Sequence, residues 1–102
     1  MIHQEIIHLE NSQADGYVAP LGPFNLVWAA TREGMIACGA FDVAALERFR
    51  YPAARLKGAG GAPIATIEDL LNGEVREANA FAREKGITPG MKGREALARL
   101  AG

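Results

Sequence analysis

The chain has 102 residues, of which 49% are hydrophobic and 23% charged, with 11 Lys and Arg against 12 Asp and Glu and a formal net charge of −1. This length and mixed composition suit one globular domain with one core and exclude a disordered or fibrous chain. The basic residues are interleaved with acidic ones, which argues against nucleic acid or an anionic membrane as a partner, because both need a basic patch.

The expected location of the protein is the cytoplasm. Cys38 is the only cysteine, so no intrachain disulfide can form and nothing points to an oxidising compartment. The segment Ile2–Glu5 lacks the basic and long apolar regions of a signal peptide. No apolar run approaches the roughly 18 residues that cross a bilayer, so we expect no membrane contact.

The first third of the chain predicts strands. Residues 2–9 are short, rich in isoleucine and loosely alternating, which favours a strand with one solvated face. Residues 11–16 have the composition of a turn. A second short strand follows at 17–19 and ends at Pro20, because proline marks a strand end or an edge.

A central hairpin is predicted over residues 24–41. Residues 24–31 and 34–41 are apolar at both alternating sets of positions, and Arg32–Gly34 forms the turn between them. Strands of this kind are covered on both faces of their sheet. The second face of this hairpin is therefore covered by a helix or by another subunit, and we favour a homodimer.

Helices and one further strand follow the hairpin. Asp42 is suited to cap a helix that ends near Tyr51, because Pro52 disfavours a helical residue before it. Residues 53–58 predict a strand, which makes strand–helix–strand a right-handed crossover into a partly parallel sheet. The later helices are expected at 66–73, after a capping box at Thr66, at 74–85 and at 92–100.

Strands followed mainly by helices indicate the α+β class. We expect a single domain over residues 1–102, with a mixed four- or five-stranded sheet centred on the hairpin and packed by three or four helices.

Three stretches together resemble a known family: Gly34–Asp42 (GMIACGAFD), Thr66–Leu71 (TIEDLL) and Gly86–Leu97 (GITPGMKGREAL). They are similar to the YunC-like proteins, small bacterial and archaeal chains classed as a domain of unknown function (DUF1805). Relatives often carry serine where this chain has Lys92, and such a serine would cap the last helix with Glu95 as its partner. The resemblance implies one α+β domain and supplies no activity.

Cys38 is the first candidate for chemistry. A thiol between a strand and the helix that starts at Asp42 can have its thiolate stabilised by the positive end of that helix. Asp42 opposes this effect, because a nearby carboxylate disfavours the thiolate. The alternative is that Cys38 is a small buried hydrophobic residue, the usual state of a free cysteine.

Gly39, Arg94 and Glu95 are the candidate ligand-binding residues. Arg94 is suited to anchor a small acidic ligand, with Glu95 holding it in place. The alternative is structural: Glu95 favours the helix start, and Arg94 forms a salt bridge elsewhere in the fold.

Two other kinds of site receive little support from the sequence. His3 and His8 fall on opposite faces of one strand, and no residue spacing is typical of metal ligands, so we predict no metal and no cofactor. The glycine loop at 57–61 precedes a capped helix but matches neither phosphate-binding fingerprint, which favours a simple flexible connection.

Two functional classes remain open. The first is a homo-oligomeric binding or interaction module with a shallow pocket near Cys38, Gly39 and Arg94. The second is a small enzyme with Cys38 as nucleophile or redox thiol, supported by Asp42, Arg94 or Glu95. We favour the first, because the sequence shows no recognisable catalytic constellation.

Overall fold

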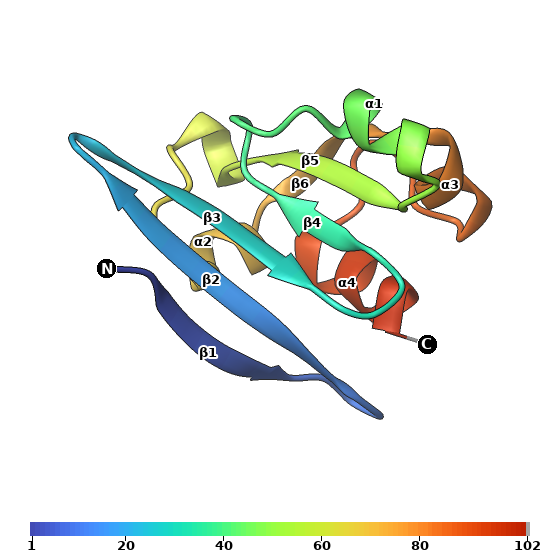
Figure 1. Cartoon of the computed structure of the whole chain (residues 1–102), viewed down its shortest axis with the longest axis horizontal. Helices are drawn as coiled ribbons and strands as arrows, with labels where there is room; N and C mark the ends of the chain where they lie inside the picture. The colour runs from blue at the N-terminus through green and yellow to red at the C-terminus, as the bar shows by residue number, and fades with distance from the viewer. Residues whose placement is uncertain (102) are drawn as a thin grey trace.

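A computed structural model describes residues 1–101 as an α+β domain built on one mixed, six-stranded sheet (Figure 1). The strands lie in chain order across the sheet, and β4 and β5 form its parallel pair. The predicted α+β class is confirmed, but the sheet has six strands where four or five were expected. The strands are β1 (His3–His8), β2 (Gln13–Leu21), β3 (Phe24–Ala30), β4 (Met35–Ala37), β5 (Ala53–Lys57) and β6 (Glu74–Ala78), and the helices are α1 (Val43–Leu46), α2 (Ile67–Leu71), α3 (Ala80–Glu84) and α4 (Gly93–Ala101).

Strand β2 is longer than the predicted 17–19 segment and takes up part of the predicted turn at 11–16. Gly16, which looked like a turn residue, is buried in the strand. A Cβ atom at this position would lie 2.7 Å from Ile67 Cδ1. Gly16 is thus a site of close approach between α2 and the sheet.

The predicted crossover is present. The carboxylate of Asp42 accepts a hydrogen bond from Ala45 N at 3.0 Å and caps α1. Strand β5 then pairs in parallel with β4, with Met35 opposite Ala53. Strand β4 is shorter than the predicted 34–41 run, and α1 continues only as a 3₁₀ turn at Glu47–Phe49.

The helix predicted over 74–85 is wrong in its first half, which is strand β6. The register between β5 and β6 passes from Arg55–Glu77 to Leu56–Val75, so β6 holds one extra residue, Arg76. This bulge separates the two core-facing residues of β6, Val75 and Ala78, by three positions instead of two. Three-residue spacing is typical of a helix, which explains the error.

The buried side chain of Asn79 joins the elements around the crossover. Its Oδ1 accepts from Ala53 N at 3.2 Å and from Ala82 N at 3.0 Å. Its Nδ2 donates to the carbonyls of Val43 at 3.0 Å and Tyr51 at 2.9 Å. The side chain is only 3% exposed, and these four bonds fill its capacity.

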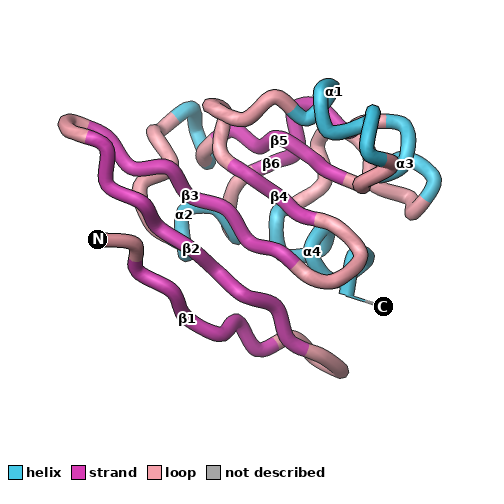
Figure 2. The backbone as a smooth tube through the Cα atoms, in the orientation of Figure 1, coloured by secondary structure: helices cyan, strands magenta, loops and turns pink. Residues whose placement is uncertain are grey.

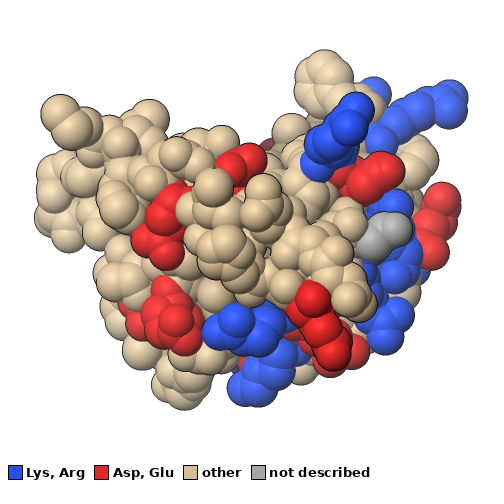
Figure 3. Space-filling model, turned by 90° about the horizontal axis from the view of Figure 1, so that it is seen from below, with Lys and Arg blue, Asp and Glu red and all other residues tan. Residues whose placement is uncertain are grey.

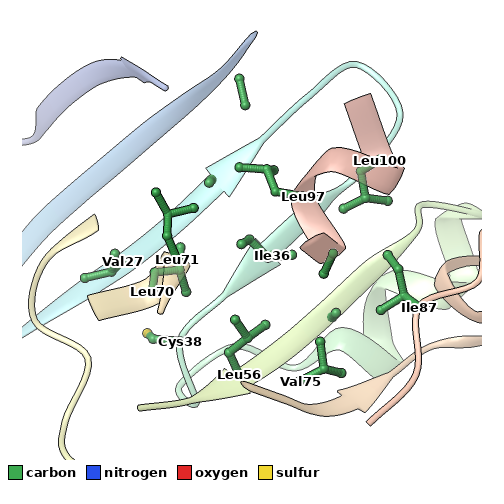
Figure 4. Packing of buried hydrophobic residues seen from close by; sticks show 14 of the residues in the cluster. Val27, Ile36, Cys38, Leu56, Leu70, Leu71, Val75, Ile87, Leu97 and Leu100 are labelled. Atoms are coloured by element: carbon green, nitrogen blue, oxygen red, sulfur yellow. The ribbon is translucent and has the colours of Figure 1, made fainter. Parts of the chain in front are cut away.

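Helices α2 and α4 pack against one face of the sheet (Figure 2). They enclose the main core, which includes Val27, Ile36, Leu56, Leu70 and Leu97 (Figure 4). On the opposite face, α1 covers a smaller cluster that contains Met35, Ala37, Val43 and Ala53. Both faces of the sheet are thus covered at β4, as predicted for the second half of the hairpin.

The same opposite face is open over β1, β2 and β3. Tyr17 and Trp28 are partly exposed there and stack with ring centroids 5.1 Å apart. In Figure 3 the left end of the molecule, where the turn between β2 and β3 lies in Figure 1, shows no charged atoms. In this outer half of the sheet, β1 to β3 with the residues beside them, the exposed large apolar side chains are Met1 (109%), Ile2 (58%), Ile6 (49%), Leu21 (47%) and Phe24 (53%).

Candidate functional site

A hollow of about 300 Å³ lies beside Cys38 and Gly39. Cys38 follows β4, and Lys57 and Gly58 at the end of β5 form another wall. The ends meet because β4 and β5 are parallel neighbours, whose carboxyl ends reach the same edge of the sheet. Ligands in open sheets of this kind commonly bind outside the carboxyl ends of parallel strands.

The glycine loop expected to be a flexible connection forms a 3₁₀ turn at Ala59–Gly61. Gly61 N donates to Gly58 O at 2.9 Å, and Ala62 N donates to Ala59 O at 3.2 Å. Gly58 and Gly61 line the hollow. The loop and the Cys38–Gly39 turn are separate in the sequence but line the same hollow.

Three basic side chains line the hollow, and no acidic side chain does. Arg55 is held by Glu77, since its Nε donates to Glu77 Oε1 at 3.1 Å. Within residues 1–101, Lys57 and Arg76 have no carboxylate within 4.0 Å. Arg76 is the extra residue of the β6 bulge, a feature that commonly redirects a side chain. The hollow is therefore positively charged.

Cys38 lies at the boundary between the core and the hollow. It is 5% exposed and belongs to the main apolar cluster, as Figure 4 shows. Its backbone N–H donates to Val27 O at 2.9 Å, which holds the turn at the end of β4. Gly39 beside it is exposed, and a Cβ there would meet only Leu56 O, at 3.9 Å.

The structure does not bring the remaining predicted site residues to this hollow. Asp42 is exposed, and its carboxylate caps α1. Arg94 and Glu95 lie at the start of α4 and line a different hollow, together with His8 and Lys92.

Nor does Glu95 hold Arg94 in place. Arg94 pairs with Glu68 at 3.5 Å, and Glu95 pairs with Arg99 at 3.4 Å. All four of these side chains are well exposed. This arrangement matches the structural alternative for Arg94, a salt bridge made elsewhere in the fold.

Comparison with known proteins places the chain in a family. A family profile described as "Domain of unknown function (DUF1805)" matches residues 37–100. The chain belongs to the DUF1805 family. It is 30% identical over 105 residues to "Uncharacterized protein YunC" of Bacillus subtilis, with 98% of each chain covered, so the predicted YunC-like relationship is confirmed.

A solved structure shares the fold of this DUF1805 domain. It is described as a protein of unknown function, TA1206, from Thermoplasma acidophilum. The two superpose with a TM-score of 0.87 and 24% sequence identity, covering 99% of this chain and 94% of the other.

The glycine-rich motif before α4 has a visible role in the DUF1805 fold. Gly93 N donates to Gly73 O at 2.9 Å, and Val75 N donates to Met91 O at 2.8 Å, so residues 90–93 run beside β6. A Cβ on Gly93 would lie 2.3 Å from Leu70 O. This motif thus fixes the contact of α4 with α2 and β6.

Sequence reasoning missed Arg55 and Arg76 as site residues. Because residues 74–85 were predicted to form a helix, the place of Arg76 in an edge strand could not be inferred. A signal was nevertheless available. The predicted parallel crossover implies that the ends of both strands lie together, and hence that residues 38–39 and 57–61 are neighbours.

Two further findings concern residues 1–101. No three His, Cys, Asp or Glu side chains in this part of the chain are grouped so that they could hold a metal ion. None of its helices combines the length and the apolar character needed to cross a membrane.

Proposed function

We propose that this protein is a self-associating cytoplasmic binding module that holds a small anionic ligand in the hollow beside Cys38. The observation that carries the proposal is the wall of that hollow, where Arg55, Lys57 and Arg76 face the ligand space without an acidic neighbour in the lining. Carboxylates and phosphates are the anions that such side chains bind by charge-assisted hydrogen bonds.

The three basic residues would have different tasks. Glu77 holds the guanidinium of Arg55 and offsets its charge, so Arg55 would mainly shape the wall. Lys57 and Arg76 have no carboxylate partner among residues 1–101 and would contact the anion directly. The volume of about 300 Å³ lies at the lower end of the range for ligand pockets, so the ligand would be small.

Titration with inorganic phosphate and with succinate, followed by amide NMR, tests the proposal. The amide signals of Gly39 and Gly58 should shift in a saturable manner with at least one of these probes. Lys57→Gln and Arg76→Gln should each weaken binding about 10-fold or more, because a hydrogen bond to a charged group contributes about 1.5–3 kcal/mol.

Arg94→Gln is the matched control, since Arg94 is an exposed arginine outside this hollow. It should leave the titration unchanged. If Arg94→Gln abolished binding while Arg76→Gln did not, the anion site would lie at α4, as the sequence alone suggested. An absence of saturable shifts with both probes would count against the anion site.

Gly39 offers an independent steric test. A Cβ at Gly39 has room, so Gly39→Leu should fold while its side chain intrudes on the hollow. We expect weaker binding of the same probe at unchanged thermal stability. Full retention of binding would place the ligand elsewhere.

A second candidate function is an enzyme in which the thiol of Cys38 is a nucleophile or redox group. Its specific support is that Cys38 shares the hollow with three basic side chains, and nearby cations favour the reactive thiolate. Asp42, Arg94 and Glu95 do not line this hollow, so Arg55, Lys57 and Arg76 would replace them as supporting groups.

Alkylation of Cys38 by iodoacetamide distinguishes the two candidates. A binding module predicts protection of the native thiol and rapid reaction only after unfolding, in keeping with its 5% exposure. Rapid alkylation of the native protein, slowed by Arg76→Gln, would favour the enzyme.

Self-association is supported by the outer half of the sheet. Ile2, Ile6, Leu21 and Phe24 are each about half exposed or more and lie on strands or at their ends. Exposed apolar groups gathered in one region commonly mark an interface.

A further inference from the structure

We infer that two copies of this chain pair through their β1 strands in an antiparallel register, with Gln4 facing Gln4 across the twofold axis. This inference rests on the self-association proposed above and names its surface. A continuous twelve-stranded sheet would result from two sheets of six strands each.

Strand β1 is the open edge of the sheet. Figures 1 and 2 show it along the lower border, with no described segment beside its outer side. At the other border, residues 90–93 run along β6, where Gly90 N donates to Val75 O at 2.8 Å and Lys92 bridges to Glu74. Along β1, every second residue therefore offers an unpaired backbone donor and acceptor on the outer side.

This edge has little of the usual protection against pairing. Natural edge strands carry proline, charged side chains, a bulge or a covering segment, and of these β1 has only the single charge of Glu5. Strand β1 has the sequence HQEIIH, and its register with β2 is regular from His3–Val18 to His8–Gln13. Five of its six residues are exposed. It is suited to accept another strand.

Symmetry limits the possible registers. In one continuous antiparallel sheet, directly opposed residues share a face, so each residue faces one of the same parity. The twofold axis then passes midway between one residue of β1 and the same residue of the second copy. For β1, axes through Glu5 and Ile6 are central, and axes through Gln4 and Ile7 lie one residue further out on either side.

The axis through Gln4 gives complementary pairs. His3 faces Glu5 of the second copy on one side of the sheet, and Ile2 faces Ile6 on the other. Within one chain, His3 Nε2 already lies 2.9 Å from Glu5 Oε1, which shows that these two groups share a face. Ile2 and Ile6, exposed by 58% and 49%, would cover each other.

The three competing axes give mismatched pairs. An axis through Glu5 sets Glu5 against its own copy and Gln4 against Ile6. An axis through Ile6 sets Ile6 against its own copy but Glu5 against Ile7. An axis through Ile7 sets Ile6 against His8 and Glu5 against Leu9. Opposite charges or apolar groups across a pair stabilise a sheet, whereas like charges destabilise it, so the axis through Gln4 is favoured.

Single cysteines introduced into a Cys38→Ala background test the register. Directly opposed residues have Cβ atoms about 4.5–5.5 Å apart, close enough for a disulfide after a small shift. Gln4→Cys should therefore cross-link rapidly under mild oxidation, at a rate independent of protein concentration. Glu5→Cys and Ile6→Cys are matched controls at exposed sites of the same strand. They should cross-link at least tenfold more slowly, because each lies two or more residues from its own copy.

The outcomes separate this inference from the proposed function. Faster cross-linking at Glu5→Cys or Ile6→Cys would overturn the register. If the Cys38→Ala protein is dimeric by light scattering and none of the three variants cross-links, the β1 edge is not the interface, although self-association stands. A monomeric protein would overturn both. Circular dichroism of each variant verifies that it is folded.

Discussion

The inner and outer halves of the sheet differ in how they are covered. At β4 and at the start of β5 both faces are buried, by α2 and α4 on one side and by α1 on the other. At β1–β3 only one face is buried, and the opposite face presents Tyr17, Trp28, Leu21 and Phe24 to solvent at least in part.

Because of this difference, the inner half should mainly stabilise the fold, and the outer half should mainly mediate association. Burial of apolar side chains is the main favourable term in folding, so most of the stability of the domain should reside in the inner half. The outer half retains apolar surface and a free strand edge, which favour contact with a second copy. Substitutions in the inner half should therefore lower the free energy of unfolding, and those in the outer half should change oligomeric state.

The largest effect is expected at Asn79, in the inner half. Asn79→Ala removes four hydrogen bonds and leaves buried backbone groups of Ala53, Val43 and Tyr51 without these partners. We expect a loss of about 3 kcal/mol in the free energy of unfolding, measured by urea denaturation. Asn11→Ala, at an exposed turn in the outer half, should change it by less than about 0.5 kcal/mol. Equal losses for both would remove the distinction between the halves.

A smaller loss is expected from Gly93→Ala. The new Cβ would lie 2.3 Å from Leu70 O and 2.7 Å from Leu56 Cδ2, so α4 must shift from its place on the core. Overpacking of this kind costs about 1–3 kcal/mol. Gly39→Ala is the matched control, because its Cβ would meet only one atom within 4 Å. A Gly93→Ala protein as stable as the Gly39→Ala protein would contradict the close contact.

In the outer half, Ile6→Lys should act on association. Ile6 is 49% exposed, so the lysine can reach solvent and the free energy of unfolding of the monomer should change little. The dimer loses the apolar contact twice, which should raise its dissociation constant on the order of tenfold. Analytical ultracentrifugation measures this change. Ala44→Lys, on the exposed surface of α1, should leave the dimer intact.

The smallest effect concerns the capping box of α2. Asp69 Oδ2 accepts from Ala65 N and Thr66 N at 3.0 Å, and these bonds lower the pKa of its carboxyl from the ordinary 3.8. A lowered pKa in the folded state adds stability that is present above pH 3.8 and is lost as pH falls through the lowered value. Asp69→Asn should therefore show a smaller drop in urea midpoint on acidification than the unmodified protein. Asn11→Ala, which removes no titratable group, should show an undiminished drop.

The sequence was most informative where a local signal agrees with the tertiary environment. The caps at Asp42 and Thr66 were predicted from side chains that accept nearby backbone N–H groups, and both are present. The crossover was likewise predicted from the order of elements. These features depend on residues close together in the chain.

The errors arose where distant contacts decide the structure. The bulge at Arg76 makes a strand look helical, and Gly16 looks like a turn residue although its role is to admit Ile67. The residues around the hollow likewise fall into those that a local pattern indicated and those that only strand pairing brings there. Cys38 and Gly39, predicted as site residues, line the hollow, and their predicted roles stay predictions; Arg55 and Arg76 join them there only because β5 pairs with β6. Pairing of this kind depends on contacts that no short stretch of sequence contains.

Light scattering on a size-exclusion column tests the contrast between the two halves most directly. If the open outer half is an association surface, the protein should elute with a mass of twice its 10.9 kDa chain at micromolar concentration. A mass of 10.9 kDa that persists as concentration rises would show that the exposed apolar residues of β1–β3 remain in water. The division between a stabilising half and an associating half would then be wrong.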